Sequence, residues 1–204
     1  MKLKKLGNSL QPIRLLVAVS IFVAGVLSYP VLLKHNFLYV PPEVIVPVAA
    51  PVVPESLDVC FTPKQSCLPK VIKAIDNAKS SIVLLGYSFT SKPITQALIK
   101  AKNRGVKVRM ILDHSQRSQK YSMQVIDLLL TEKIPIRFDH SVKIAHNKII
   151  VLDGKQTVTG SYNWTHSAEF KNAENLVFIN SPKVAQQYCI YFEGRWKVSK
   201  PQKD

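Results

Sequence analysis

From residue 56 onward the sequence alternates between two hydrophobic periods, and this alternation limits the possible fold more than any other feature. Short apolar runs with strand character lie at 81–87, 106–112, 134–138, 148–153, 156–159 and 175–179. Between them, apolar residues at helical spacing predict helices around 68–75, 94–101, 121–130 and 182–196. This alternation favours an α/β fold in which helices flank a layered, mixed and mostly parallel sheet. We therefore expect one catalytic domain over residues 56–200, with its active site where strand ends meet loops.

Polar residues at fixed spacing surround the hairpin predicted at 148–159. His146 and Lys148 stand at the start of its first strand, and Ser161 and Asn163 follow its second strand. Because residues two apart on a strand point the same way, His146 and Lys148 can face one pocket. A neutral imidazole can attack phosphorus and form a covalent intermediate. An ammonium, a hydroxyl and a carboxamide can neutralise and hydrogen-bond the phosphate oxygens as charge develops on them.

Each of these residues has a simpler interpretation when it is taken alone. An isolated His146 would be a core histidine, and an isolated Lys148 a surface charge. The presence of Gly160-Ser161-x-Asn163 as well favours a phosphodiester site. Asp153 is different, because it begins an Asp-Gly turn and a role in that turn explains it as well as a catalytic role does. We leave Asp153 out of the catalytic set.

The full pattern resembles the HxK(x)4D(x)6GSxN signature of the phospholipase D superfamily, with every defined position filled. The resemblance runs from about Val59 to Trp196 and points to bacterial nucleases with a single motif and to small bacterial phospholipase D-like proteins. It implies a catalytic set made of His146, Lys148, Ser161, Asn163 and Glu174. In that set Lys148, Ser161 and Asn163 bind the substrate phosphate. Glu174 is expected to hydrogen-bond the far nitrogen of the nucleophile His146 and so orient its ring.

A single motif has a consequence for assembly. The two-step reaction needs a nucleophile and also a general acid for the leaving oxygen, whereas one motif supplies one histidine. The remaining histidines lack Lys and Ser/Asn companions: His35, His114, His140 and His166. A two-fold homodimer with two copies of His146 across one pocket would supply the acid, and the resemblance implies the same arrangement. No cofactor and no metal are expected, because the motif already provides the nucleophile and the phosphate clamp.

The first 55 residues differ in composition from the rest. In residues 1–36, four basic residues precede an uncharged run at 15–33, which predicts a signal peptide or an N-terminal membrane anchor. The 19-residue length of the run favours the anchor. Residues 37–55 are rich in proline and predict an extended linker. In a bacterial host both alternatives place the catalytic domain outside the cytosol, either in the cell envelope or secreted.

Three cysteines are present. Cys60 and Cys67 enclose a short loop and could form a disulfide in an oxidising compartment, or remain two thiols. Cys189 lies among apolar residues and is predicted to be in the core. No zinc-binding spacing is present.

The charge of the chain fits a polyanionic partner but does not choose one. The formal net charge is +15, and residues 56–204 hold 23 Lys and Arg against 11 Asp and Glu. Nucleic acid and an anionic membrane surface both suit such an excess. Three functions remain open. The leading one is a metal-independent, non-specific endonuclease acting on DNA, with RNA as an open possibility. The alternatives are a phospholipase D that hydrolyses phospholipid head groups and an anchored, non-catalytic nucleic-acid-binding accessory protein.

A lipase would expose an apolar rim near its pocket, and a nuclease would carry a basic groove with stacking aromatic residues. Phe89, Tyr162 and Trp164 lie near the motif in sequence and are expected to pack in the core instead.

Overall fold

The computed structural model describes residues 56–202. The N-terminal segments predicted as signal peptide or anchor (1–36) and as most of the linker (37–55) lie outside the described residues. The elements in chain order are β1 (Ser56–Thr62), α2 (Leu68–Asn77), β2 (Ser81–Gly86), α3 (Lys92–Asn103), β3 (Lys107–Asp113), the 3-10 helix η1 (His114–Ser118), α4 (Lys120–Thr131), β4 (Ile136–Asp139), β5 (Lys148–Leu152), β6 (Gln156–Gly160), α5 (His166–Phe170), β7 (Glu174–Asn180), α6 (Pro182–Val198) and β8 (Lys200–Pro201).

The described strands form one mixed sheet in the order β1-β7-β6-β5-β2-β3-β4-β8. The predicted α/β fold with a mixed sheet is confirmed, but the expectation of a mostly parallel sheet is wrong. Only β2–β3 and β3–β4 are parallel, and the other five pairs are antiparallel. The reason lies in the connections. Helices join the first parallel strands, whereas a short turn at Asp153 and Gly154 joins β5 to β6 and can only connect antiparallel strands.

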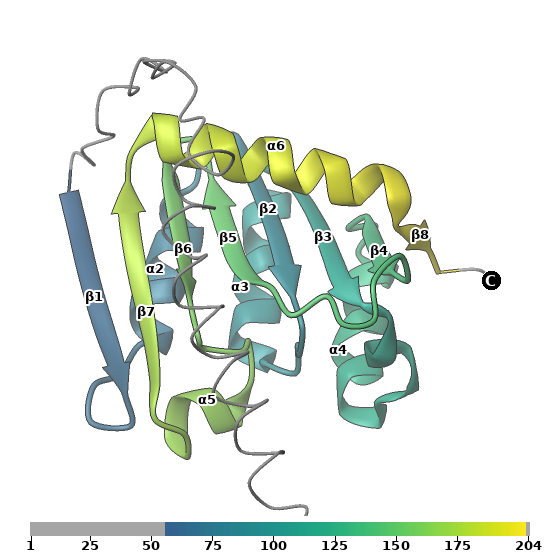
Figure 1. Ribbon diagram of the computed structural model, residues 1–204, viewed down its shortest axis with the longest axis horizontal. Coiled ribbons are helices and arrows are strands. Elements are labelled where there is room, and N and C mark those ends of the chain that lie inside the picture. The colour runs from purple at the N-terminus through teal and green to yellow at the C-terminus, as the bar shows by residue number, and fades with distance from the viewer. Residues whose placement is uncertain (1–55, 203–204) are drawn as a thin grey trace, which may run out of the picture. The chain divides into compact units, whose positions relative to one another are not determined.

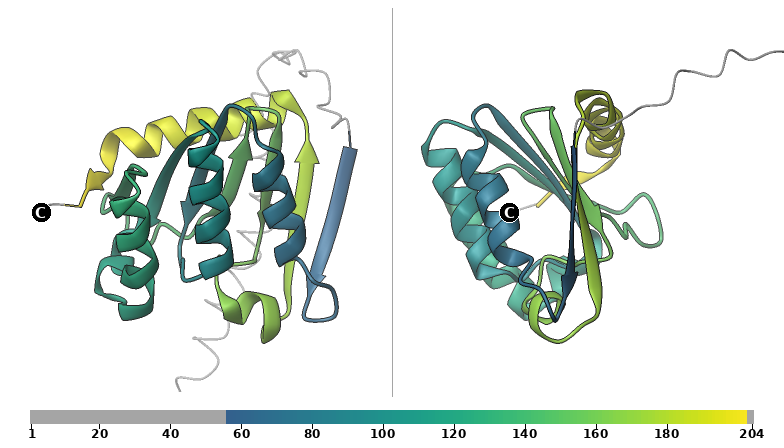
Figure 2. Two further views of the ribbon diagram at one scale, coloured as in Figure 1. Left: turned by 180° about the vertical axis from the view of Figure 1, so that it is seen from behind. Right: turned by 90° about the vertical axis from the view of Figure 1, so that its left-hand side faces the viewer.

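The sheet separates two layers of helices (Figures 1 and 2). Of the described helices, α2, α3 and α4 cover one face, and α6 lies across the other. Side chains of β2 alternate accordingly. Ile82 and Leu84 join the large core under α2–α4, whereas Val83 and Leu85 join a smaller core under α6 with Phe192.

Local signals explain where the helices begin. Ser91 accepts a hydrogen bond from the backbone N–H of Ile94 at the start of α3, and Ser181 accepts one from Val184 at the start of α6. Each of these helices also has a proline in its first turn, where the missing N–H costs nothing. All the predicted helices and strands are present within a few residues of their expected bounds.

Strand β1 was not predicted, and its pattern explains the omission. Among the described strands it pairs with β7 alone, at the edge of the sheet. Its apolar residues Leu57, Val59 and Phe61 point outward and are 59%, 47% and 51% exposed, while Cys60 and Thr62 point into the core. Cys60 is joined to Cys67 by a disulfide, which ties β1 to the start of α2. No helix within residues 56–202 combines the length and the apolar character needed to cross a membrane.

Candidate active site

Three neighbouring strand ends bring the motif residues together. Strand β5 begins at Lys148, β6 ends at Gly160 and β7 begins at Glu174. These strands are adjacent and antiparallel, with Ile149 opposite Thr159 and Gly160 opposite Leu176. These four residues therefore meet at one end of the three strands, although they span 29 positions of the chain: His146, Lys148, Ser161 and Glu174.

The His146–Lys148 pair is held against Tyr87. The rings of His146 and Tyr87 have centroids 4.6 Å apart, and Nζ of Lys148 lies 5.1 Å from the Tyr87 ring centroid. Nζ of Lys148 also donates to the backbone oxygen of His146 at 3.3 Å. His146 is exposed, whereas Lys148 is only 6% exposed. Tyr87 is a site residue that the sequence analysis did not assign.

The electrostatics of Lys148 fit a phosphate-binding group. Burial lowers the pKa of its ammonium, and the negative charge of Glu174 partly offsets that shift. A buried ammonium with few partners has a strong preference for an anion, because an anion restores the charge stabilisation lost on burial. Lys148 is therefore suited to hold a phosphate next to His146.

Glu174 is found at the site, but its hydrogen bonds differ from the predicted ones. Its carboxylate accepts from the hydroxyl of Ser161 at 2.6 Å and from the side-chain amide of Asn172 at 2.9 Å. Among the described residues there is no hydrogen bond between Glu174 and His146, so the expected orienting contact is not present. Ser161 in turn accepts from the backbone N–H of Asn175 at 3.1 Å.

The segment carrying Asn163 is fixed by its two neighbours rather than by Asn163 itself. Tyr162 and Trp164 are 1% and 0% exposed, as predicted for packing residues. The Tyr162 hydroxyl donates to Glu169 at 3.0 Å, and Nε1 of Trp164 donates to the backbone oxygen of Leu85 at 3.1 Å. The Oδ1 atom of Asn163 is buried and has no hydrogen-bond partner among the described residues. It is an available acceptor beside the site.

Glycine is required at position 160 by the close approach of β7. A Cβ atom on Gly160 would lie 2.1 Å from the backbone oxygen of Asn175. The Ser161 N–H donates to that same oxygen at 3.1 Å. The small residue therefore allows β7 to come close enough to fix Ser161 in the motif.

A cleft opens beside His146 on the face of the sheet that α6 covers. Its volume is about 490 Å³, and it is lined by His146, Lys148 and Thr159 together with Gln187, Tyr188 and Tyr191 of α6. Ser161 and Asn163 do not line this cleft. It therefore provides space next to the candidate nucleophile rather than a complete phosphate pocket.

Asp153 lies at the opposite end of β5 and has a structural role. Its carboxylate accepts from the backbone N–H groups of Lys79, Ser80 and Ser81, at 2.7 to 3.1 Å. Burial would raise the pKa of Asp153, but these hydrogen bonds outweigh burial and lower it. The residue stands in the left-handed region at φ 55°, which suits a turn.

The other described histidines make their ring contacts with residues outside the motif. His114 and His140 lie beside each other, with ring centroids 5.2 Å apart, and His166 contacts Phe170. Within residues 56–202, no group of three or more His, Cys, Asp or Glu residues is arranged to hold a metal ion. Cys189 is a free thiol, half-buried against the small core under α6.

Comparison with known proteins gives consistent relatives. Residues 71–196 match the family described as "Cardiolipin synthase, PLD-like domain". The chain is 41% identical over 144 residues to a phospholipase D from Rickettsia prowazekii, covering 71% of this chain and 69% of that protein. It is 31% identical to the mitochondrial cardiolipin hydrolase of Mus musculus, covering 71% of this chain and 65% of that protein.

Solved structures agree with the sequence relatives. The phospholipase D family member Nuc from Salmonella typhimurium superposes with a TM-score of 0.70 at 37% identity, covering 73% of this chain and 99% of that chain. NucT from Helicobacter pylori has the same fold, with a TM-score of 0.67 at 21% identity, covering 72% of this chain and 99% of that chain.

Proposed function

Because this chain belongs to the phospholipase D superfamily and is a phosphodiesterase hydrolase, we propose that it cleaves nucleic acid with His146 as the nucleophile. The observation that carries the proposal is the meeting of His146, the buried Lys148 and Ser161 at adjacent strand ends. The two groups needed first, a nucleophilic imidazole and a positive charge for the phosphate, are neighbours there.

The reaction proceeds in two displacements. The unprotonated ring nitrogen of His146 attacks phosphorus, a P–N bond forms and the P–O bond to the leaving group breaks. The leaving oxygen takes a proton from a general acid. Water then attacks the phosphohistidine while the former acid, now a base, removes its proton. A new P–O bond forms, the P–N bond breaks, and both groups return to their starting state.

Lys148 stabilises the charge that grows on the phosphate oxygens in both steps. An ammonium in a partly desolvated site interacts with such charge more strongly than one in water. Asn163 adds a neutral donor, and Ser161 adds a second once its hydroxyl turns from Glu174, to which it donates in the free chain. The chemistry needs no metal ion, because the nucleophile and the charge stabilisation both come from side chains.

The general acid is the His146 of a second chain, in a homodimer with the pocket on its two-fold axis. Within one chain, no other described histidine belongs to the motif: His114 and His140 contact each other, and His166 contacts Phe170. An exposed apolar row on β1, formed by Leu57, Val59 and Phe61, supports self-association, because large exposed apolar strips mark contact surfaces.

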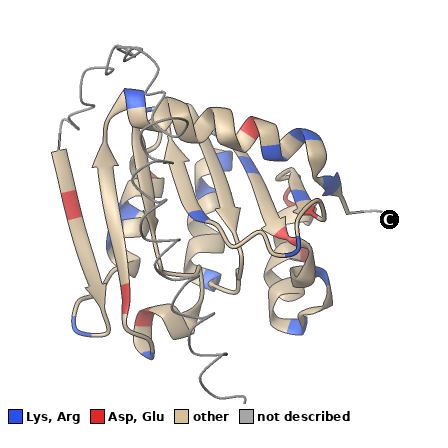
Figure 3. Ribbon diagram, viewed as in Figure 1, with Lys and Arg blue, Asp and Glu red and all other residues tan. Residues whose placement is uncertain are grey.

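The charge of the domain suits nucleic acid as the substrate, and the basic residues that flank the motif support this choice. Figure 3 shows Lys and Arg segments outnumbering Asp and Glu segments across the domain, in keeping with 23 basic against 11 acidic residues from 56 to 204. Exposed Lys143 lies three residues before His146, and exposed Lys171 three residues before Glu174. Such flanking charges suit a phosphate backbone that extends beyond the scissile bond. The Salmonella relative is named Nuc.

Phospholipid is a second candidate substrate, and a specific observation favours it. Val142 and Ile144, in the loop that leads to His146, are 41% and 52% exposed. Such side chains suit a lipid surface better than a nucleic acid. The Rickettsia and mouse relatives carry the names phospholipase D and mitochondrial cardiolipin hydrolase.

We propose that, in a bacterial host, the catalytic domain lies in the cell envelope or outside the cell. The Cys60–Cys67 disulfide supports this location, because disulfides persist in oxidising compartments. The uncharged run at 15–33 supports delivery by a signal peptide or attachment by an anchor.

The substrate is tested with the purified full-length protein in excess EDTA. Plasmid DNA, single-stranded RNA, phosphatidylcholine vesicles and cardiolipin vesicles are offered separately, with His146→Ala as the control. The proposal predicts turnover of DNA that the control lacks. Turnover of lipid alone would replace nucleic acid by phospholipid. DNA binding without turnover of any phosphodiester would indicate a non-catalytic binding protein.

A further inference from the structure

The nucleophile is carried by a loop with an unusual path. Residues 140–147 join β4 to β5, and in the sheet these strands are separated by β3 and β2. The loop therefore runs across the ends of both intervening strands before it reaches His146 (Figure 1). The loop contains no helix or strand.

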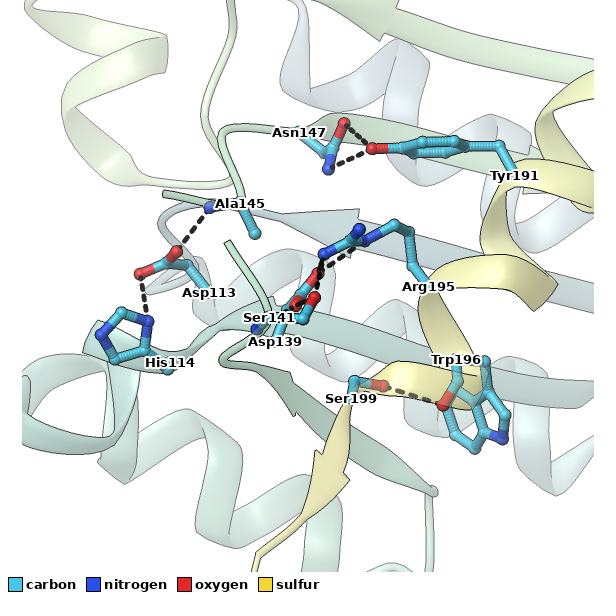
Figure 4. Close-up of polar contacts among 10 residues, drawn as sticks. All are labelled: Asp113, His114, Asp139, Ser141, Ala145, Asn147, Tyr191, Arg195, Trp196 and Ser199. Atoms are coloured by element: carbon cyan, nitrogen blue, oxygen red, sulfur yellow. Dashed lines mark hydrogen bonds and ion pairs between the residues drawn. The ribbon is translucent and has the colours of Figure 1, made fainter. Parts of the chain in front are cut away.

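Three contacts fasten this loop to the strand ends, and Figure 4 shows the residues of the first two. At its start, Asp139 accepts from the backbone N–H of Ser141 at 3.0 Å and from Nε of Arg195 at 2.7 Å. At the end of β3, Asp113 accepts from the backbone N–H of Ala145 at 2.7 Å. Just after β2, the backbone N–H of Tyr87 donates to the backbone oxygen of Asn147 at 2.8 Å.

The contact at Asp113 is the one that directly precedes the nucleophile. Asp113 is 2% exposed and is the last residue of β3. Its second carboxylate oxygen accepts from the backbone N–H and the hydroxyl of Ser115. Burial would raise the pKa of Asp113, but the hydrogen bonds from Ser115 and Ala145 outweigh burial and lower it. The bond to Ala145 is therefore a charge-assisted one.

His146 depends on its backbone for its position. Among the described residues, its imidazole makes no hydrogen bond, and its side chain is exposed. Its ring contact is with Tyr87. The neighbouring Ala145 is 6% exposed, so its N–H has no access to water and needs the acceptor that Asp113 provides.

We propose that Asp113 is a positioning residue that holds the crossover loop so that His146 stands beside Lys148. The proposal rests on His146 being the nucleophile of the function proposed above. Asp113 does not touch the substrate. It acts through the Ala145 N–H, and displacing a reacting group by about 1 Å costs on the order of 100-fold in rate.

The variant Asp113→Asn tests the role. Asparagine has one acceptor oxygen, whereas the carboxylate serves N–H donors on both of its oxygens. Because Ser115 presents two donors to its oxygen and Ala145 presents one, the amide oxygen stays with Ser115 and the amide N–H faces Ala145, whose N–H loses its acceptor. We expect kcat to fall at least 10-fold while KM stays within about twofold, since the phosphate clamp of Lys148 is kept.

Asp153→Asn is the matched control. Asp153 also accepts backbone N–H bonds at a strand end and also has a lowered pKa, but it lies at the opposite end of β5. Asparagine suits its left-handed backbone. The Asp153→Asn substitution should lower the melting temperature without lowering kcat. Ser115→Ala, which keeps the Ala145 bond, should also retain kcat.

The measurement is steady-state kinetics of the full-length proteins on bis(p-nitrophenyl) phosphate in EDTA, together with their melting temperatures. If Asp113→Asn does not fold, Asp113→Glu carries the same test, because it keeps the charge and moves the carboxylate by one methylene. A kcat loss confined to the Asp113 variants supports the proposal. Wild-type kcat in a folded Asp113 variant would overturn it and leave the proposed function intact. A wild-type protein without phosphodiester turnover would overturn the proposed function, and the role of Asp113 with it.

Discussion

Replacement of Glu169 should destabilise the domain strongly, because this buried carboxylate joins three separate segments. Its side chain is 3% exposed and lies on α5. It accepts from the hydroxyl of Ser66 at 2.8 Å, the backbone N–H of Leu68 at 2.9 Å and the hydroxyl of Tyr162 at 3.0 Å. Through Tyr162 it also fixes the segment between Ser161 and Asn163.

The magnitude follows from which partners lose their acceptor. In Glu169→Ala the hydroxyl of exposed Ser66 can turn to water, whereas the partly buried Leu68 N–H and the buried Tyr162 hydroxyl lose a charged acceptor. Hydrogen bonds to a charged group contribute about 1.5–3 kcal/mol each, so two of them give a loss of about 3–6 kcal/mol. Removing the carboxylate also removes the cost of burying its charge, which offsets part of this loss. We therefore expect the free energy of unfolding to fall by about 3 kcal/mol.

Glu169→Gln should cost much less. Its single oxygen can accept from both Leu68 and Tyr162, as one carboxylate oxygen does now. Its amide can donate to Ser66, whose hydroxyl is able to accept. Only the charge is then lost, at a cost of about 1 kcal/mol.

The assay is equilibrium unfolding in urea, followed by circular dichroism and tryptophan fluorescence. Glu132→Ala is the control, because Glu132 forms an exposed ion pair with Lys102 at 3.6 Å and such pairs contribute about 0–1 kcal/mol. A loss of less than about 1 kcal/mol in Glu169→Ala, or equal instability of the Gln and Ala variants, would show that Glu169 does not join these segments through its hydrogen bonds.

Three further predictions concern the chemistry, the assembly and the pH dependence. Phosphodiesterase activity should survive excess EDTA, and full loss that a divalent ion restores would contradict the His146 mechanism. Excess His146→Ala chain, exchanged into wild type, should reduce activity in proportion to the fraction of mixed dimers. Mixing His146→Ala chains with Lys148→Ala chains should not restore activity. If activity simply followed the fraction of wild-type chains, monomers would act alone. Hydrogen bonds lower the pKa of Asp153, so its stabilisation is complete above the ordinary value of 3.8 and is lost as the pH falls below it. Urea unfolding between pH 5 and 2 should therefore give a shallower acid-side slope for Asp153→Asn, and an unchanged slope would contradict this.

The central part of the fold could be predicted because its residues alternate with a clear period. Strands such as β2 and β3 are buried on both faces and helices such as α3 have one apolar stripe, so pattern alone identified them. The sequence of a strand does not show which other strands it pairs with, or in which direction. For this reason β1, whose outward residues are apolar, was missed, and the share of antiparallel pairs was underestimated.

The same distinction applies to the site. Its short-range part was predictable, because His146 and Lys148 share a strand end and Ser161 follows the return strand of the same hairpin. Contacts over long sequence distances were not. Glu169 reaches back to Ser66, Asp113 reaches forward to Ala145, and Glu174 bonds to Ser161 rather than to His146. No local spacing encodes these choices, since they depend on which strand ends the sheet brings together.

The most direct test of the account is to trap the covalent intermediate. Full-length protein is mixed with a p-nitrophenyl phosphodiester in EDTA and quenched in alkali, where phosphohistidine persists. Peptides are then compared by mass spectrometry with those of His146→Ala. We expect a phosphoryl adduct on the peptide that contains His146, formed at the rate of the first p-nitrophenol release and absent from the variant. An adduct on another residue, or near-native turnover by His146→Ala, would contradict the account.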